Sequence, residues 1–120
     1  MPTSRLPNYI RTHRKRAYLT QVEVAYLVGA KSGARISRHE HFKESPNLQT
    51  LLAYELLFGT PARDLFGGIH REVEQKLRDR IRCLIRKISR VGKNRVAKQK
   101  IEMLKEFLDK SEWHAAATTA

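Results

Sequence analysis

The sequence predicts an all-α protein, and three observations lead to this fold class. Apolar residues recur every third or fourth position over most of the chain, which is the period of an amphipathic helix. Residues that favour helix caps, together with glycines and prolines, divide this pattern into segments. The alternation of apolar and polar residues that is typical of a half-buried strand is not found, so we expect helices and no sheet.

The first two helices are predicted between Pro7 and Gly29. Pro7 suits the first turn of a helix, because its fixed φ is helical and the N–H that it lacks has no partner there. Thr20 and Glu23 have the spacing of a capping box, so a second helix begins just after Thr20, and Gly29 ends it. The positions expected to face the core are Leu6, Ile10, His13 and Ala17 in the first helix and Val24, Ala25 and Val28 in the second.

A turn and a third helix follow Gly29. Residues 30–33 are small or polar and include a glycine, which is typical of a turn, and a helix over about 33–41 follows. Ile36 and His39 lie three residues apart, so they share one face of this helix and are expected to point into the core. The other positions are polar, and the outer face is therefore expected to lie away from the core.

The fourth and fifth helices are predicted from their ends. Asn47 follows a proline and can cap the fourth helix, which Gly59 ends. Thr60 and Pro61 begin a short fifth helix that closes at Leu65 and Phe66. Gly67 and Gly68 then mark the end of a first domain, which we predict to comprise residues 5–68. The fourth helix is expected to bury Leu48, Leu51, Leu52 and Leu56.

Residues 69–113 are predicted to form one or two amphipathic helices as a C-terminal extension, with a break at 91–94. Residues 114–120 are small and polar, and we expect a frayed tail there. Cys83 lies at the margin of the apolar arc, where we expect a small buried thiol. The arc comprises Ile69, Val73, Leu77, Ile81, Leu84, Ile85, Ile88 and Val91, and then Val96, Ile101, Leu104, Phe107 and Leu108.

Charge and composition restrict the function. The chain of 120 residues has 24 Lys and Arg against 12 Asp and Glu, a net charge of +12. This excess favours a polyanionic partner, with nucleic acid first and an anionic membrane surface second. No apolar run is long enough to span a bilayer, and the N-terminus lacks the apolar region of a secretory signal. A single cysteine excludes an intrachain disulfide and a cysteine-based zinc site, so we expect a cytoplasmic protein.

The second and third predicted helices have the outline of a helix-turn-helix, in which the first helix is buried and supports a second that enters the major groove of DNA. Arginine can pair with guanine O6 and N7 through two hydrogen bonds, and small residues let the helix approach the bases closely. The plainer alternative is that the charged residues are only a solvated helix face. The residues expected on a DNA-binding surface are Gln21, Lys31, Ser32, Ala34, Arg35, Arg38 and Lys43.

Residues 6–66 resemble the Cro/repressor-type helix-turn-helix family, often called the XRE family. The likeness covers about half of the chain, in the order of the family and with nearly its spacing. It rests on Tyr9-Ile10, Arg14, Leu19-Thr20-Gln21-Val22-Glu23-Val24-Ala25, Val28-Gly29, Ile36-Ser37-Arg38-His39-Glu40, Pro46-Asn47-Leu48-Gln49-Thr50-Leu51, Phe58-Gly59 and Leu65-Phe66.

This resemblance implies a five-helix, lambda-repressor-like domain that binds operator DNA as a dimer and regulates transcription. It implies that Gln21 touches a phosphate, that Ala34, Arg35 and Arg38 lie on the base-reading face, and that Arg14 and Glu40 form a structural ion pair. The chain departs from the family in three places. The turn before Ile36 is one residue longer, Phe42 stands where glycine often ends the third helix, and Glu55 stands where alanine is usual.

The expected function is therefore that of a sequence-specific, homodimeric transcriptional regulator associated with the nucleoid. We expect no enzyme activity, no metal and no cofactor, because no nucleophile–base pair, metal cluster or phosphate-binding glycine loop is found. Residues 69–113 are open to three interpretations, namely dimerisation, packing within the chain and contact with nucleic acid through the basic surface. Alternatively, the chain is an antitoxin-like DNA-binding protein in which these helices bind a partner protein, or the basic helices alone bind nucleic acid.

Overall fold

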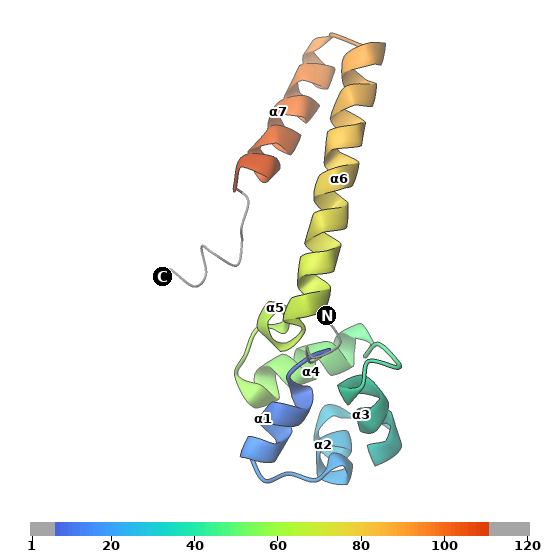
Figure 1. Ribbon diagram of the computed structural model, residues 1–120, viewed down its shortest axis with the longest axis vertical. Helices are drawn as coiled ribbons and strands as arrows, with labels where there is room; N and C mark the ends of the chain where they lie inside the picture. Colours follow the sequence, from blue (N-terminus) through green and yellow to red (C-terminus); the bar gives the residue numbers. More distant parts are fainter. Residues whose placement is uncertain (1–6, 111–120) are drawn as a thin grey trace, which may run out of the picture. The chain divides into compact units, whose positions relative to one another are not determined.

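The computed structural model describes residues 7–110, and all the regular elements in this range are helices (Figure 1). Residues 7–110 form seven helices in succession and contain no strand, so the all-α prediction is confirmed. The chain divides into two compact units, Met1–Glu72 and Val73–Ala120, and each is described by itself.

Helix α1 extends over Ile10–Arg16 and begins later than predicted. The backbone N–H of Tyr9 donates to the carbonyl of Leu65 over 2.8 Å, and the side chain of Asn8 accepts from the N–H of Ile10 over 3.0 Å. These bonds hold the segment after Pro7 outside the helix, so the proline does not occupy the first helical turn. Ile10 is buried as expected, whereas Ala17 lies at the C-terminal end of the helix and is exposed; Leu6 lies outside the described residues.

Helix α2 extends over Gln21–Val28 and has the predicted ends. The hydroxyl of Thr20 accepts from the N–H of Glu23 over 3.0 Å, and the carboxylate of Glu23 accepts from the N–H of Thr20 over 2.9 Å. Gly29 ends the helix with a left-handed φ of 77°, a conformation that glycine adopts without steric cost. The three residues expected in the core, Val24, Ala25 and Val28, are buried.

Helix α3, Gly33–Glu40, packs mainly against α2, and its side chains Ile36 and His39 are buried as predicted. Ser32 caps α3 by accepting from the N–H of Arg35 over 3.4 Å. A Cβ atom at Gly33 would lie 3.1 Å from Cγ2 of Val22 and 3.2 Å from its backbone nitrogen. The N-terminal ends of α2 and α3 therefore approach so closely that a side chain at position 33 would require Val22 to shift by a few tenths of an ångström.

Helix α4 extends over Leu48–Phe58, and its ends at Asn47 and Gly59 are those predicted. Its buried face was predicted wrongly. Thr50 and Tyr54 are buried, whereas the expected core residues Leu48, Leu52 and Leu56 are 69%, 47% and 85% exposed, and Leu51 is only half-buried. Both faces of this helix contain apolar residues, so the periodicity alone does not determine which face packs inward.

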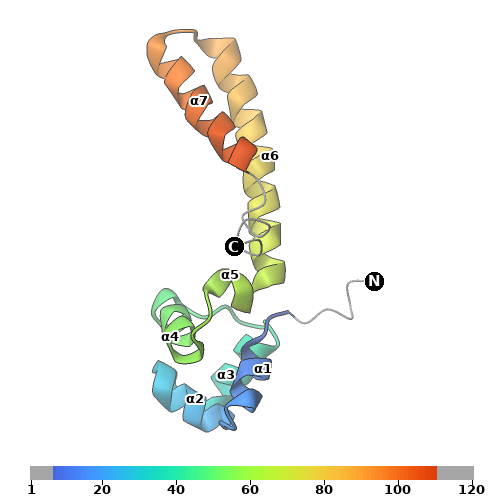
Figure 2. The same ribbon diagram turned by 90° about the vertical axis from the view of Figure 1, so that its left-hand side faces the viewer.

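Helix α5 is a single turn, Ala62–Leu65, that completes the core of the first unit. The carboxylate of Glu55 accepts from the N–H of Ala62 over 2.5 Å, and this contact ties the start of α5 to α4. Figure 2 shows α1 to α5 grouped around a common interior. That interior is formed by Ile10, Val24, Ala25, Val28, Ile36, Tyr54, Leu65 and Phe66.

Helix α6, Gly67–Val91, begins in the first unit and continues into the second, where it lies beside α7, Arg95–Lys110 (Figures 1 and 2). The predicted break between the two helices is confirmed, and the side chain of Asn94 caps α7 by accepting from the N–H of Ala97 over 2.8 Å. One guanidinium nitrogen of Arg78 donates to the carbonyl of Leu108 over 2.8 Å and links the two helices.

The apolar arc of these two helices is less buried than predicted. Ile81 and Ala97 are the buried residues of α6 and α7, and Cys83, which was expected to be buried, is exposed. A single helix partner covers only part of a broad apolar arc, which explains the exposure of the rest. Trp113 and the tail 114–120 lie outside the described residues. The exposed members of the arc include Val73, Leu77, Leu84, Val91 and Val96.

Candidate nucleic-acid interface

Helix α3 has one buried face and one outward face. Ile36 and His39 are at most 2% exposed and attach the helix to the core. Ala34 and Arg38 are exposed on the other side, and Arg35 is half-buried. The structure thus brings together, on one accessible surface, the three residues that were predicted to read bases.

The outward face also contains a residue that the sequence did not indicate. Glu44 lies in the loop after α3 and forms ion pairs with both arginines. One carboxylate oxygen accepts from Nη1 of Arg35, and the other accepts from Nε of Arg38 over 2.9 Å. The two guanidinium groups are therefore held by a single carboxylate.

The surroundings of Glu44 favour the ionised form of its carboxyl group. The hydrogen bond from Arg38 lowers the pKa of the Glu44 carboxyl below its ordinary value, although partial desolvation acts in the opposite direction. The charges of Arg35 and Arg38 lower this pKa further. Glu44 is consequently ionised near neutral pH, and the outer face of α3 combines two positive charges with one negative charge.

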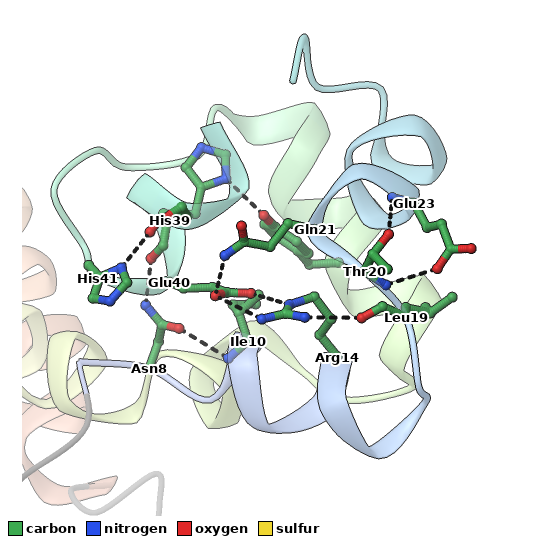
Figure 3. A network of polar contacts seen from close by, with 12 residues as sticks. Asn8, Ile10, Arg14, Leu19, Thr20, Gln21, Glu23, His39, Glu40 and His41 are labelled. Atoms are coloured by element: carbon green, nitrogen blue, oxygen red, sulfur yellow. Dashed lines mark hydrogen bonds and ion pairs between the residues drawn. The ribbon is translucent and has the colours of Figure 1, made fainter. Parts of the chain in front are cut away.

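A buried polar network lies beside this surface (Figure 3). Arg14 on α1 donates through Nε to Glu40 on α3 over 2.5 Å, and its side chain is 10% exposed against 1% for Glu40. Gln21, at the start of α2, donates its side-chain amide to the same carboxylate over 3.1 Å. The ion pair that the family resemblance implies is present, and the amide of Gln21 faces it.

An open hollow of about 540 Å³ lies next to this network. The hollow is bounded by several basic side chains and by the N-terminal end of α2, where the positive end of the helix dipole favours anions. Such a combination of helix N-terminus and guanidinium or ammonium groups suits a phosphate oxygen. The lining residues are Arg11, Arg14, Lys15, Leu19, Thr20, Gln21, Glu40 and His41.

The remaining predicted contacts lie near the two ends of α3. Lys31 and Ser32 precede the helix and are exposed, and the hydroxyl of Ser32 is used as its N-terminal cap. Lys43 follows the helix, where its backbone N–H donates to the carbonyl of Arg38 over 2.8 Å and its side chain is exposed. Positive charge therefore lies at both ends of the outward face.

A polar pair joins the inward side of α3 to α4. Nδ1 of His39 lies 2.8 Å from the hydroxyl of Tyr54, and the two rings meet edge to face. Burial lowers the pKa of His39. Burial raises the pKa of Tyr54, and the negative charge of Glu40 raises it further. Both groups are therefore uncharged near neutral pH and serve as part of the core.

Three residues of this region were not found from the sequence. Asn8 donates its side-chain amide to the carbonyl of His39 over 2.9 Å, and an asparagine two residues before a helix could have indicated such a role. Tyr54 was hidden among the leucines of α4. Glu44 lies six residues beyond Arg38 and outside the helix, so no helical spacing connects them.

Comparison of the chain with protein-family models, with curated proteins and with solved structures finds no match. Within residues 7–110, no three His, Cys, Asp or Glu side chains are grouped in a way that would hold a metal ion. No helix in that range is both long and apolar enough to cross a membrane.

Proposed function

We propose that this chain is a sequence-specific DNA-binding regulator of transcription of the Cro/repressor type, with α2 and α3 as its helix-turn-helix. The single observation behind this proposal is the arrangement of α3. Its inner face is locked into the core by Ile36 and His39, while Ala34, Arg35 and Arg38 face outward together.

The dimensions and chemistry of α3 suit the major groove. An α-helix with its side chains is about 10–12 Å across, and the major groove is about 12 Å wide. The small side chain of Ala34 permits close approach, and either arginine is able to pair with guanine through two hydrogen bonds.

Contacts with the DNA backbone would fix the register of α3. Lys31 and Lys43 lie at the two ends of the outward face, where they can meet phosphates on either side of the groove. The hollow at the start of α2 adds Arg11 and Lys15, together with the backbone N–H groups of the helix. These contacts would supply affinity that depends on salt, whereas the arginines of α3 would supply sequence preference.

The helices α6 and α7 are proposed to hold two copies together, so that two α3 helices reach successive half-sites. Val73, Leu77 and Leu84 are 59%, 42% and 45% exposed along α6, which leaves apolar surface for a second copy. The same surface favours one alternative, in which an antitoxin-like protein uses these helices to bind a different protein. Either role places the protein with DNA in the cytoplasm.

Selection of sequences from random duplex DNA by the full chain tests the main proposal. We expect enrichment of a site with two related halves, and weaker enrichment after Arg38→Ala, because one base-reading side chain is lost. A full chain that binds duplexes without enriching any sequence would contradict specific recognition. The alternative is tested by purification of the tagged chain from its host, where a stoichiometric second protein would favour an antitoxin-like function over a homodimeric regulator.

A further inference from the structure

Glu44 holds the two arginines of α3 in an unequal way. Arg38 uses only Nε for its bond to Glu44, and neither of its Nη nitrogens has a partner within residues 7–110. Arg35 instead uses Nη1, and its own Nε is buried without a hydrogen-bond partner in the same range. The outer edge of the Arg38 guanidinium is therefore available, whereas Arg35 is more enclosed.

The backbone after α3 determines where Glu44 lies. Phe42 adopts a left-handed φ of 51°, and the N–H groups of Phe42 and Lys43 donate to the carbonyls of His39 and Arg38 over 3.0 and 2.8 Å. These bonds turn the chain back over the last turn of the helix. Glu44 is thus brought beside Arg38 by a closed turn, and its position does not depend on a flexible loop.

We propose that Glu44 is a positioning residue for DNA recognition, which holds Arg38 so that its two Nη nitrogens point toward guanine O6 and N7. This inference rests on the proposed function of α3. A guanidinium has five N–H donors in a rigid fork, so a carboxylate on Nε leaves the Nη edge able to make two parallel bonds. Ordering this side chain before binding removes part of the entropy that recognition otherwise costs.

The same carboxylate would also act against binding to random DNA. The carboxyl of Glu44 is ionised near neutral pH, since its ordinary pKa of 4.5 is lowered further by the hydrogen bond from Arg38. A fixed negative charge on the outward face repels phosphates, whereas a correctly placed guanine accepts the arginine fork without displacing the carboxylate. Glu44 therefore increases the difference between specific and random binding in two ways.

The simpler alternative is that Glu44 only stabilises the fold, in which case its loss would shift the thermal unfolding curve. Both ion pairs are partly exposed, with side-chain exposures of 38% and 44% for the arginines and 30% for Glu44. Ion pairs of this kind contribute little to folding. Loss of the carboxylate is thus expected to leave the thermal unfolding curve nearly unchanged while altering recognition.

The test compares the full chain with Glu44→Gln, Arg38→Ala and Glu72→Gln in selections from random duplex DNA. Glu72→Gln is the matched control, because it also removes one negative charge, here from an exposed side chain on α6. We expect Glu44→Gln to lose about tenfold in preference for guanine at the same position that Arg38→Ala relaxes, with the other positions unchanged. We also expect it to bind a random duplex several-fold more tightly than Glu72→Gln does.

Two outcomes would overturn the role of Glu44. One is a selected profile identical to that of the unmodified chain, and the other is an even loss of preference at every position, which a general loosening of the domain would produce. A different result, in which the unmodified chain enriches no sequence, would refute the proposed function and this inference with it. The selection with the unmodified chain reveals that failure by itself, before any variant is measured.

Discussion

Arg14 and Glu40 join α1 to α3 through two hydrogen bonds between buried charged groups. The guanidinium donates to the two carboxylate oxygens over 2.5 and 3.3 Å, and it also donates to the carbonyl of Leu19 over 3.0 Å. Gln21 adds a further donor to Glu40. The pair therefore connects three successive helices, and its charges compensate each other where water is largely excluded.

Removal of both partners should cost less than the two single removals added together. We expect Arg14→Met or Glu40→Leu to reduce the free energy of unfolding by about 3–5 kcal/mol, because each leaves a buried charge without its partner. The double variant should lose less than the sum of the two single losses. Urea unfolding followed by circular dichroism measures all three, and strictly additive losses would show that the two residues do not act as a pair.

The lowered pKa of His39 makes the stability of the fold depend on pH. Burial lowers its pKa in the folded state below the ordinary 6.5, so below that pH the unfolded chain binds the proton more readily than the folded chain does. The stabilisation is complete above pH 6.5 and is lost as the pH falls below it. Glu44, whose pKa is also lowered, acts with the same sign but nearer its ordinary value of 4.5.

Titration of the histidine ring signals by NMR checks this directly, with a midpoint for His39 expected below 6.5. The temperature at the midpoint of thermal unfolding should be lower at pH 5 than at pH 7. His41→Asn, which changes an exposed histidine on the same segment, should keep this dependence. A His39 midpoint at or above the ordinary value would mean that the ring is not held in its uncharged form.

The local structure of the first unit could be predicted because short-range chemistry determines it. Thr20 and Glu23 form the predicted capping box, Gly29 ends α2, and Asn47 caps α4. His39 could be placed in the core because it shares a helix face with Ile36. The contact between Arg14 and Glu40 spans 26 residues, and only the family resemblance indicated it.

Other features depend on tertiary contacts that periodicity does not encode. Helix α4 buries Tyr54 and exposes Leu56, because the tyrosine ring fills the interior and its hydroxyl reaches His39, which a leucine cannot do. Glu44 could not be assigned to the site, since its approach to Arg38 depends on the left-handed turn at Phe42. The sequence thus indicated the arginines of the candidate surface but not the carboxylate that pairs with them.

Tyr18 is strained, and this leads to an unusual prediction. Its φ of 61° is left-handed although its side chain is 93% exposed, so the residue has the cost of this conformation with little packing in return. Tyr18→Gly should therefore raise the free energy of unfolding by about 1 kcal/mol.

Tyr26→Gly is the matched control, since Tyr26 is 85% exposed but lies within α2. Glycine is the poorer helix former, and this variant should lose about 0.5 kcal/mol. Chemical denaturation of the two variants gives both values. If both changes lower stability, the exposed ring of Tyr18 contributes more than its backbone conformation costs.

Arg38→Ala and Lys43→Ala should affect DNA binding differently, although each removes one positive charge from the same region. Loss of Arg38 should reduce the preference for the selected site over a random duplex by about 1–3 kcal/mol, because a base contact is lost. Loss of Lys43 should weaken binding to both duplexes alike and reduce the slope of log K against log salt by about one unit, because a phosphate contact is lost. Fluorescence anisotropy at several salt concentrations distinguishes the two effects, with each variant serving as the charge control for the other. Equal losses on both duplexes for Arg38→Ala would place its guanidinium on the backbone and remove it from base recognition.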